Sequence, residues 1–283
     1  MKKFVLGIIA LACISAQAEY SPEGKTIKVV LPQGPASGMA MIYRYIENYA
    51  AKNKINMVPV FKPGAESKIG LQYYVATQDK TGDTLLLSAT SDVVEQNFPT
   101  HLEAVTSVIG ISPVLVASKK SGIKSTKDIA AIEKNSPGKL NWAVSNSVQT
   151  SILYTVAESL GADKKKLAKV SYPAGGGHSQ SNIMSGDIDL AWFPKTTAEK
   201  LSSTGHVHMV ELDAATISAL ERKQNVSAIF LPRGASNDAI KYWEEFIVKF
   251  HEDMESAENM RANGVPAILG RDQLVKYINN WSE

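Results

Sequence analysis

Fold and site both depend on one segment of this chain, VPVFKPGAESKIGLQYYVATQDKTGDTLLL, at residues 58–87. Residues 58–61 include the β-forming side chains of a strand, and Pro63-Gly64-Ala65 predicts a turn. Apolar residues then recur at helical spacing over residues 69–75, and residues 84–87 form the short apolar run of a buried strand. The segment therefore predicts a strand, a glycine turn, a helix and a second strand of an α/β sheet.

The glycine turn is the first candidate binding feature. A turn that joins a strand to a helix N-terminus leaves backbone N–H groups pointing outward, and such groups bind anions. We therefore take Gly64, Ala65, Glu66 and Ser67 as candidate ligand-binding residues. Whether they belong to a pocket depends on the loops that the rest of the chain supplies.

The first eighteen residues have the features of a secretory signal peptide. Two lysines precede an apolar run over residues 4–14, and Ala16-Gln17-Ala18 is a small-x-small cleavage site. The apolar run is well below the ~20 residues that a membrane span needs. We expect cleavage after Ala18 and export to the periplasm, with Cys13 leaving a lipoprotein cleavage site as an alternative.

Charge and cysteine content narrow the class of protein. Removal of Lys2 and Lys3 from the 30 basic residues leaves 28, equal to the 28 acidic residues, so the formal charge of the mature chain is zero. The absence of a basic excess argues against nucleic acid or an anionic membrane as a partner. Cys13 is the only cysteine, so the mature chain folds without disulfides. We expect a monomer without cofactor or metal.

Residues 27–87 predict a βαβαβ unit. A strand at residues 27–31 leads into a proline- and glycine-rich loop at residues 32–38, and a helix with an apolar face follows. The segment at 58–87 completes the unit, and a polar loop at residues 88–92 comes after it. Ligands bind at the carboxyl ends of the strands in such sheets, so these loops add three candidate binding residues: Gln33, Ser37 and Thr90.

The second half of the chain predicts a similar sheet. Residues 105–118 form a β-rich run interrupted by a proline, which we interpret as one strand that crosses between lobes. The strand at 140–144 opens into a polar loop, and the strand at 167–172 opens into a glycine-rich loop at 173–179. A strand at 188–193 and a returning strand at 227–231 follow. The loops contribute the further candidates Ser145, Asn146, Ser147, Gln149, Gly176, Gly177 and His178.

Together these units predict an α/β fold of two lobes, each a sheet flanked by helices, with the ligand cleft between them. The expected divisions are a signal peptide at 1–18, lobe I at 19–116 and 228–283, and lobe II at 117–227. We expect the lobes to close by a hinge motion about the two crossings of the chain.

Several motifs, in their order and spacing, resemble the solute receptors of tripartite tricarboxylate transporters, the Bug-type periplasmic binding proteins. The family has a Pro-Gly-Ala turn, an Ile-Gly pair and a Gly-x-Thr-Leu-Leu strand, and a later Pro-Gly-Lys-Leu-Asn segment. The matching residues are Pro63-Gly64-Ala65, Ile69-Gly70, residues 82–86 and residues 137–141, with further matches at Val170, Tyr172, Gly186, Ile188 and Asp189 and, in the first loop, Pro32 and Arg44. The resemblance implies a type II periplasmic-binding fold whose lobes close over a small carboxylate, and a two-subunit membrane permease as partner.

The chain departs from the family in the loops that would contact the ligand. Glu66 and Ser67 stand where the family has glycines, and residues 146–149 replace a Gly-x-Gly-Ser segment. Side chains at such positions change the size of a pocket and place their own groups at the ligand. Because Glu66 would repel a second carboxylate, citrate does not follow from the resemblance, and a smaller, neutral or amine-bearing ligand is a hypothesis.

Other local patterns point less clearly to chemistry. Gly175-Gly176-Gly177 lacks the lysine and Ser/Thr of a phosphate-binding P-loop, so we interpret it as a carboxylate loop. The His-Val-His segment at 206–208 has no third metal ligand near it, and the Ser-x-x-Lys pattern at 121–124 has no Lys-Thr-Gly companion. Trp192 and Phe193 fit either stacking on an aromatic ligand or core packing.

We predict a non-enzymatic receptor that captures a small organic acid in the periplasm for a tripartite tricarboxylate-type transporter. Two alternatives stay open. A ligand-sensing module for a membrane receptor would have the same fold and the same binding step. An exported serine hydrolase is disfavoured, because no nucleophile–His–acid set lies at the expected strand ends.

Overall fold

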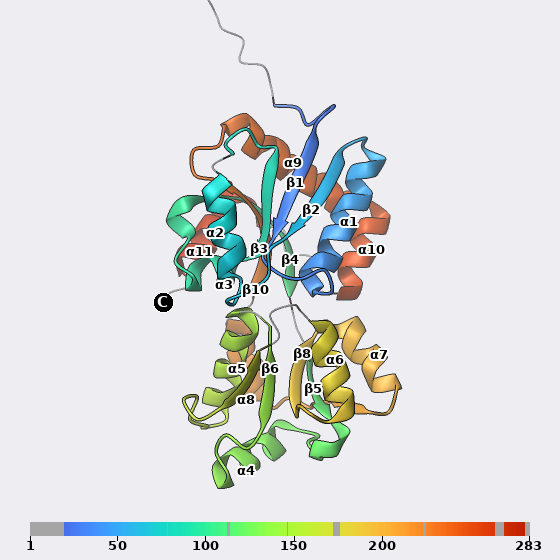
Figure 1. The fold of residues 1–283 in the computed structure, drawn as a ribbon, viewed down its shortest axis with the longest axis vertical. Coiled ribbons are helices and arrows are strands. Elements are labelled where there is room, and N and C mark those ends of the chain that lie inside the picture. The colour runs from blue at the N-terminus through green and yellow to red at the C-terminus, as the bar shows by residue number, and fades with distance from the viewer. Residues whose placement is uncertain are drawn as a thin grey trace, which may run out of the picture.

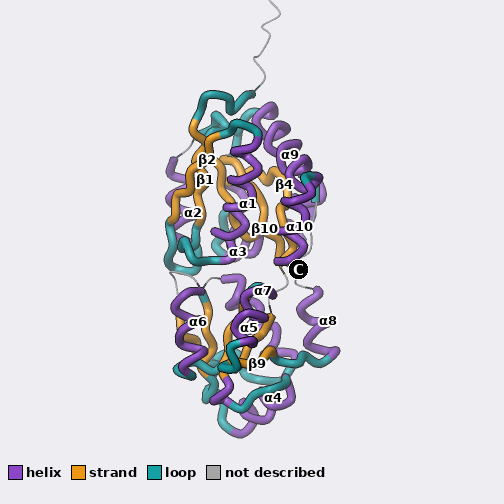
Figure 2. The backbone as a smooth tube through the Cα atoms, turned by 90° about the vertical axis from the view of Figure 1, so that its right-hand side faces the viewer, coloured by secondary structure: helices purple, strands orange, loops and turns teal. Residues whose placement is uncertain are grey.

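The computed structural model describes residues 20–77, 79–111, 114–145, 147–171, 176–222, 225–263 and 269–280. These residues form two five-stranded sheets covered by helices, and Figure 1 shows the two resulting lobes one above the other. The view from the side in Figure 2 shows the same division. The predicted two-lobed α/β fold is confirmed.

Lobe I contains the sheet with the strand order β2-β1-β3-β10-β4. Its strands are β1 (Thr26–Leu31), β2 (Asn56–Phe61), β3 (Thr84–Ala89), β4 (Leu102–Ile111) and β10 (Asn225–Pro232). Its helices are α1 (Gly38–Lys52), α2 (Lys68–Thr77), α3 (Thr90–Glu95), the 3₁₀ turn η1 (Pro99–His101), α9 (Asn237–Glu252), α10 (Met254–Asn263) and α11 (Arg271–Asn280). β1 is parallel to β2 and β3, whereas β10 is antiparallel to both β3 and β4.

Lobe II contains the sheet with the strand order β7-β6-β8-β5-β9. Its strands are β5 (Val114–Ser118), β6 (Asn141–Val144), β7 (Ala168–Ser171), β8 (Leu190–Phe193) and β9 (Val207–Met209). Its helices are the 3₁₀ turn η2 (Lys119–Ser121), α4 (Thr126–Asn135), α5 (Ser147–Ser159), α6 (Gly176–Ser185), α7 (Lys195–Ser203) and α8 (Ala214–Arg222). β6 is parallel to β7 and β8, and β5 is antiparallel to β8 and β9.

The chain passes between the lobes twice. β4 of lobe I is followed by β5 of lobe II, and α8 of lobe II is followed by β10 of lobe I. The expected division at residues 116/117 falls within β5, and the one at 227/228 falls within β10. All strands of lobe II therefore come from one continuous part of the chain, whereas the sheet of lobe I is completed only by β10.

The segment at residues 58–87 forms β2, α2 and β3 in the predicted order. A side chain at Gly70 would place its Cβ 2.5 Å from the Cα of Pro32, so only glycine allows α2 to lie this close to the end of β1. The hydroxyl of Tyr74 donates to the carbonyl oxygens of Thr84 (3.0 Å) and Phe230 (3.1 Å), which ties α2 to β3 and β10. Gly70 and Tyr74 thus fix this helix on the sheet, whereas Ile69 is exposed.

Three local predictions are wrong. The polar loop expected at residues 88–92 is the end of β3 and the start of α3, and the glycine-rich loop expected at 173–179 becomes helical at Gly176. α3 begins without a side-chain cap, so the sequence carries no N-cap signal there. The run at 105–118 is two strands in different lobes rather than one.

Helices cover both faces of the lobe I sheet. α1 and α9 pack on one face, and α2 and α11 pack on the other. The apolar residues Ile240, Trp243, Ile247 and Phe250 of α9 follow one another at helical spacing and are all buried. Within the described ranges, no helix has the length and apolar character needed to cross a membrane.

Candidate functional site

A cavity of about 560 Å³ lies between the two lobes. This volume is within the range of small-molecule binding sites. The residues that line it are Gln33, Pro35, Ala36, Ser37, Gly38, Met39, Met41, Ile42, Arg44, Ala89 and Ile109 of lobe I, and Ser145, Gln149, Ile152, Gln180, Trp192, Phe193, Pro194 and Thr197 of lobe II. The lining comes from strand ends and from the first turns of helices, as expected for an α/β sheet.

Three helices begin at this cavity, α1 from lobe I and α5 and α7 from lobe II, whereas α6 contributes only Gln180, its fifth residue. None of the three has an acidic residue in its first turn. Among the helices that begin elsewhere, α4 and α9 carry Asp128 and Asp238 there, whereas α2 and α8 also carry no acidic residue. An N-terminal carboxylate would neutralise the positive end of the helix dipole, and no residue of these three first turns does so.

The first turn of α1 is held by its cap. The hydroxyl oxygen of Ser37 accepts a hydrogen bond of 3.1 Å from the backbone N–H of Ala40. A Cβ added at Gly38, the first residue of α1, would lie 3.4 Å from Cγ of Pro194, the residue that precedes α7. The N-termini of α1 and α7 therefore meet across the boundary between the lobes.

Gln149 organises the lobe II wall. Its side-chain oxygen accepts hydrogen bonds from the backbone N–H of Ser145 (2.8 Å) and from the hydroxyl of Ser145 (2.9 Å). Its amide nitrogen donates to the carbonyl oxygen of Trp192 at 3.3 Å. One side chain thus joins the end of β6 to the end of β8 and sets the shape of this wall.

Gln33 is buried at the cavity with its amide unused. Its side chain is only 8% exposed, and no hydrogen bond joins its amide to any residue that the structure describes. The amide is not among the fully enclosed polar atoms without a partner, so it stays accessible to a molecule in the cavity. The cavity therefore offers a group that both donates and accepts, and that a ligand would satisfy.

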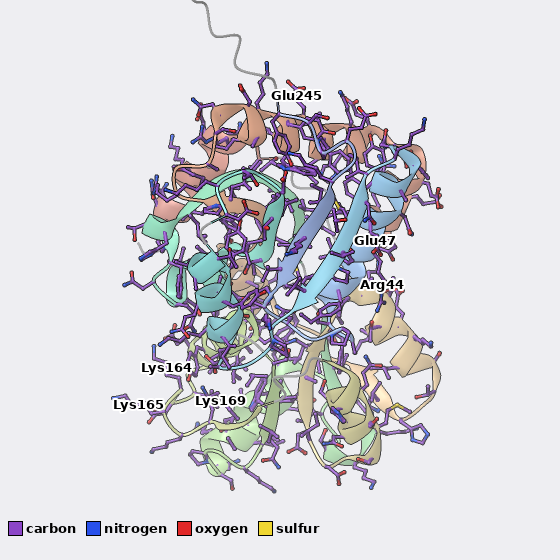
Figure 3. The ribbon with its side chains drawn as sticks, turned by 45° about the horizontal axis from the view of Figure 1, so that its top comes forward. Arg44, Glu47, Lys164, Lys165, Lys169 and Glu245 are labelled. Carbon is purple, nitrogen blue, oxygen red and sulfur yellow. The ribbon has the colours of Figure 1, made fainter. Side chains whose placement is uncertain are left out.

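Arg44 is the only charged residue among the described residues that line the cavity. Its guanidinium donates from Nη2 to the carbonyl oxygen of Pro35 at 3.0 Å, and the side chain is exposed. Figure 3 shows Arg44 on α1 at the level where the lobes meet. The positive charge is therefore at the edge of the cavity, beside the loop that precedes α1.

The glycine turn has an unusual backbone. Gly64, Ala65, Glu66 and Ser67 all have positive φ angles, of 128°, 46°, 51° and 75°. Side-chain residues pay about 1–2 kcal/mol each for this left-handed conformation. The hydroxyl of Ser67 donates to Oδ2 of buried Asp92 at 2.6 Å, which holds the turn against α3.

Glu66 makes a contact between the lobes. Its Oε1 accepts a hydrogen bond of 3.4 Å from the hydroxyl of Thr150 on α5. Residues 64–67 do not belong to the lining of the cavity described above. The repulsion of a second carboxylate by Glu66 therefore has no geometric basis at this cavity, and ligand binding by the turn stays a prediction.

The structure brings together four of the predicted binding residues, Gln33, Ser37, Ser145 and Gln149. Thr90 is fully buried at the start of α3 and does not belong to the lining, although Ala89 before it does. Ser147 begins α5, Gly176 and Gly177 begin α6, His178 is exposed on α6, and Asn146 lies outside the described residues.

Sequence reasoning missed several lining residues. Arg44 entered the sequence analysis only as a match to the first loop of the family. Pro194 and Thr197 follow β8 at its carboxyl end, so the rule that ligands bind at the carboxyl ends of strands would have selected them. Trp192 and Phe193, expected in either a stacking or a core role, are buried and also line the cavity. Within the described ranges, no cluster of three or more His, Cys, Asp or Glu side chains could hold a metal ion.

Comparison with solved structures gives extensive matches to this fold. A protein described as a periplasmic transporter has a TM-score of 0.80 and 18% identity, covering 91% of this chain and 94% of its own. The periplasmic binding protein BugD has a TM-score of 0.77 and 15% identity, covering 90% and 93%. MatC from Rhodopseudomonas palustris, with bound malate, has a TM-score of 0.75 and 15% identity, covering 90% and 96%.

These neighbours are periplasmic binding proteins of the Bug type, so the resemblance found in the sequence is confirmed at the level of the fold. Searches against protein-family models and against curated proteins give no match.

Proposed function

We propose that this chain, which shares the fold of periplasmic solute-binding proteins, is a receptor that captures a small organic acid between its lobes. It delivers the acid to a two-subunit membrane permease of the tripartite tricarboxylate type. The observation that carries the proposal is the cavity between the lobes, at which three helix N-termini without acidic residues lie.

The physics of these helix ends suits a carboxylate. Each N-terminus carries about half a positive charge and stabilises an anion by about 0.3–1 kcal/mol at an exposed site, and by up to about 2 kcal/mol in a partly buried one. The free backbone N–H groups also donate hydrogen bonds to the anion. Several such ends at one cavity bind a carboxylate without a buried salt bridge.

Binding rather than catalysis fits the side chains at the cavity. Serine and threonine hydroxyls are present, but the described residues that line it include no histidine, aspartate or glutamate to act as a general base. A nucleophilic serine needs such a base within hydrogen-bond reach. The related folds are also those of binding and transport proteins.

Location and mechanism follow from the same proposal. Removal of residues 1–18 by cleavage after Ala18 releases the receptor into the periplasm. The ligand enters when the lobes are apart and is enclosed when they close about the two crossings of the chain. The receptor acts as a monomer and presents the closed form to the permease.

The proposal is tested by mass spectrometry of the natively purified protein, followed by calorimetric titration with the copurifying acid and with malate. A variant with a carboxylate in the first turn of α7, Thr197→Glu, should weaken binding at least about tenfold, which corresponds to about 1.4 kcal/mol. Thr197→Gln, of the same size and uncharged, is the matched control. Equal affinity of the two variants, binding of no acid, or turnover of the bound compound would each overturn the proposal.

A further inference from the structure

The positive features of the cavity are gathered at one end. The N-termini of α1 and α7 meet there, since a Cβ at Gly38 would lie 3.4 Å from Cγ of Pro194. Arg44 reaches the same place, because its guanidinium bonds to the carbonyl oxygen of Pro35, just before α1. The corresponding donors in front of α5 are already occupied, since the N–H and hydroxyl of Ser145 both donate to Gln149. The cavity therefore has one anion-binding end.

Most of the remaining wall is apolar, apart from the polar side chains of Ser145, Gln149, Gln180 and Thr197. Met39 and Ile42 of α1, Ile109 of β4, Ile152 of α5 and Trp192 of β8 are all buried and all line the cavity. A second ionised group on the ligand would lose its hydration against these side chains without a partner. The wall therefore favours a body made mostly of hydrocarbon.

An ammonium group has no partner in the cavity. The described residues of the lining include no carboxylate, and a buried cation without a counter-charge is strongly unfavourable. Glu66 does not supply the missing charge, because it lies outside the lining and accepts a hydrogen bond from Thr150. Amino acids and amines are therefore poor ligands.

Gln33 adds one neutral polar contact. Its side chain is 8% exposed, lines the cavity and makes no hydrogen bond with a described residue. An amide can donate or accept, so it fits a carbonyl or hydroxyl group on the ligand. A ligand without such a group leaves the amide unpaired, and this lowers its affinity.

We infer that the ligand is an acid with a single carboxylate, no ammonium group and a mainly apolar body that carries one uncharged oxygen at the position of Gln33. The inference rests on the proposed function and narrows it. The carboxylate lies at the α1–α7 end, the hydrocarbon lies along the apolar wall, and Gln33 determines the preference for the oxygenated acid.

A panel of five compounds tests the ligand class by isothermal titration of the full mature chain. Hexanoate and 5-oxohexanoate have one carboxylate and an apolar body, leucine adds an ammonium group, citrate adds carboxylates, and hexanamide has no charge. We expect 5-oxohexanoate to bind most tightly, and leucine, citrate and hexanamide to bind at least about tenfold more weakly.

The outcomes separate this inference from the proposed function. Tighter binding of citrate or leucine than of both monocarboxylates would refute the ligand class and leave a carboxylate receptor in place. Binding of hexanamide as tightly as hexanoate would refute the anion-binding end. No binding by any acid in the panel would overturn both.

The role of Gln33 is tested by the ratio of two affinities. The unaltered chain should prefer 5-oxohexanoate to hexanoate by about tenfold, and Gln33→Leu should bring this ratio to about one. Gln72→Leu makes the same change on the exposed face of α2, away from the cavity, and should keep the ratio. Because the readout is a ratio within one variant, a general loss of folded protein does not imitate the result. An unchanged ratio in Gln33→Leu contradicts the assignment.

Discussion

Replacing Ala65 by glycine should stabilise the folded protein, although the same replacement in a helix is destabilising. Ala65 is held at a φ of 46°, between neighbours that are also left-handed. An alanine in this conformation costs about 1–2 kcal/mol because its Cβ approaches the following carbonyl oxygen. Glycine removes that strain but has a more flexible unfolded chain, which costs about 0.5–1 kcal/mol. Since the side chain of Ala65 is exposed, little packing is lost.

The expected net change for Ala65→Gly is a gain of about 0.5–1 kcal/mol in the free energy of unfolding. For a chain of this size it corresponds to a rise of about 1–4 °C in Tm. Ala131→Gly is the matched control, because Ala131 is also exposed and lies in the interior of a helix, α4. The control should lose about 0.5–1 kcal/mol.

Urea denaturation of both variants, followed by circular dichroism, measures the two changes. Because both variants replace an exposed alanine by glycine, a difference in stability between them reports the backbone conformation at each site. Equal destabilisation in the two variants would refute the reasoning, because it would mean that the turn is not strained by its side chains.

Three further predictions concern a close approach, the contact between lobes and pH. Gly70→Ala should lose about 1–3 kcal/mol in urea denaturation, because its Cβ would lie 2.5 Å from the Cα of Pro32; unchanged stability contradicts it. Thr150→Val removes the 3.4 Å hydrogen bond to Glu66 and should weaken ligand binding up to about fivefold, because it favours the open form. Small-angle scattering of the free variant should show a larger radius of gyration, and an unchanged radius would contradict this prediction. Burial lowers the pKa of His251 below its usual value of about 6.5. As the pH falls below about 6.5, the unfolded chain gains a proton at this histidine while the folded state keeps it neutral, so the folded state loses stability relative to the unfolded state. His251→Gln should therefore reduce the fall in the free energy of unfolding between pH 7.5 and pH 5.

The order of strands and helices could be predicted from the sequence because burial imposes short-range patterns. The segment at 58–87 alternates and then changes to helical spacing, and the structure has β2, α2 and β3 there. The loops at the carboxyl ends of strands led to Gln33, Ser37, Ser145 and Gln149 in the same way. These inferences need only the geometry of an α/β sheet.

The rest of the site depends on contacts between distant residues. Ala65-Glu66-Ser67 contains no glycine, so nothing local predicts a left-handed backbone, and the bond from Ser67 to Asp92 that holds it joins residues 25 apart. α7 begins after Pro194, which has no side-chain cap, so its N-terminus carries no sequence signal. Helix starts of this kind are visible only once the sheet is assembled.

The position of β10 inside the lobe I sheet has a consequence for synthesis. β10 lies between β3 and β4, so until residues 225–232 have been made β3 is paired only with β1 and β4 is paired with no described strand of its sheet. Roughly 120 residues separate the end of β4 from the end of β10, and translation at about 5–20 residues per second takes about 6–24 s to deliver them. Lobe II, built from a continuous segment, can fold within that time, whereas lobe I cannot. Only the part of the chain that forms lobe I therefore keeps an incomplete sheet until synthesis is nearly finished, and threading through a translocation channel requires such an unfolded state.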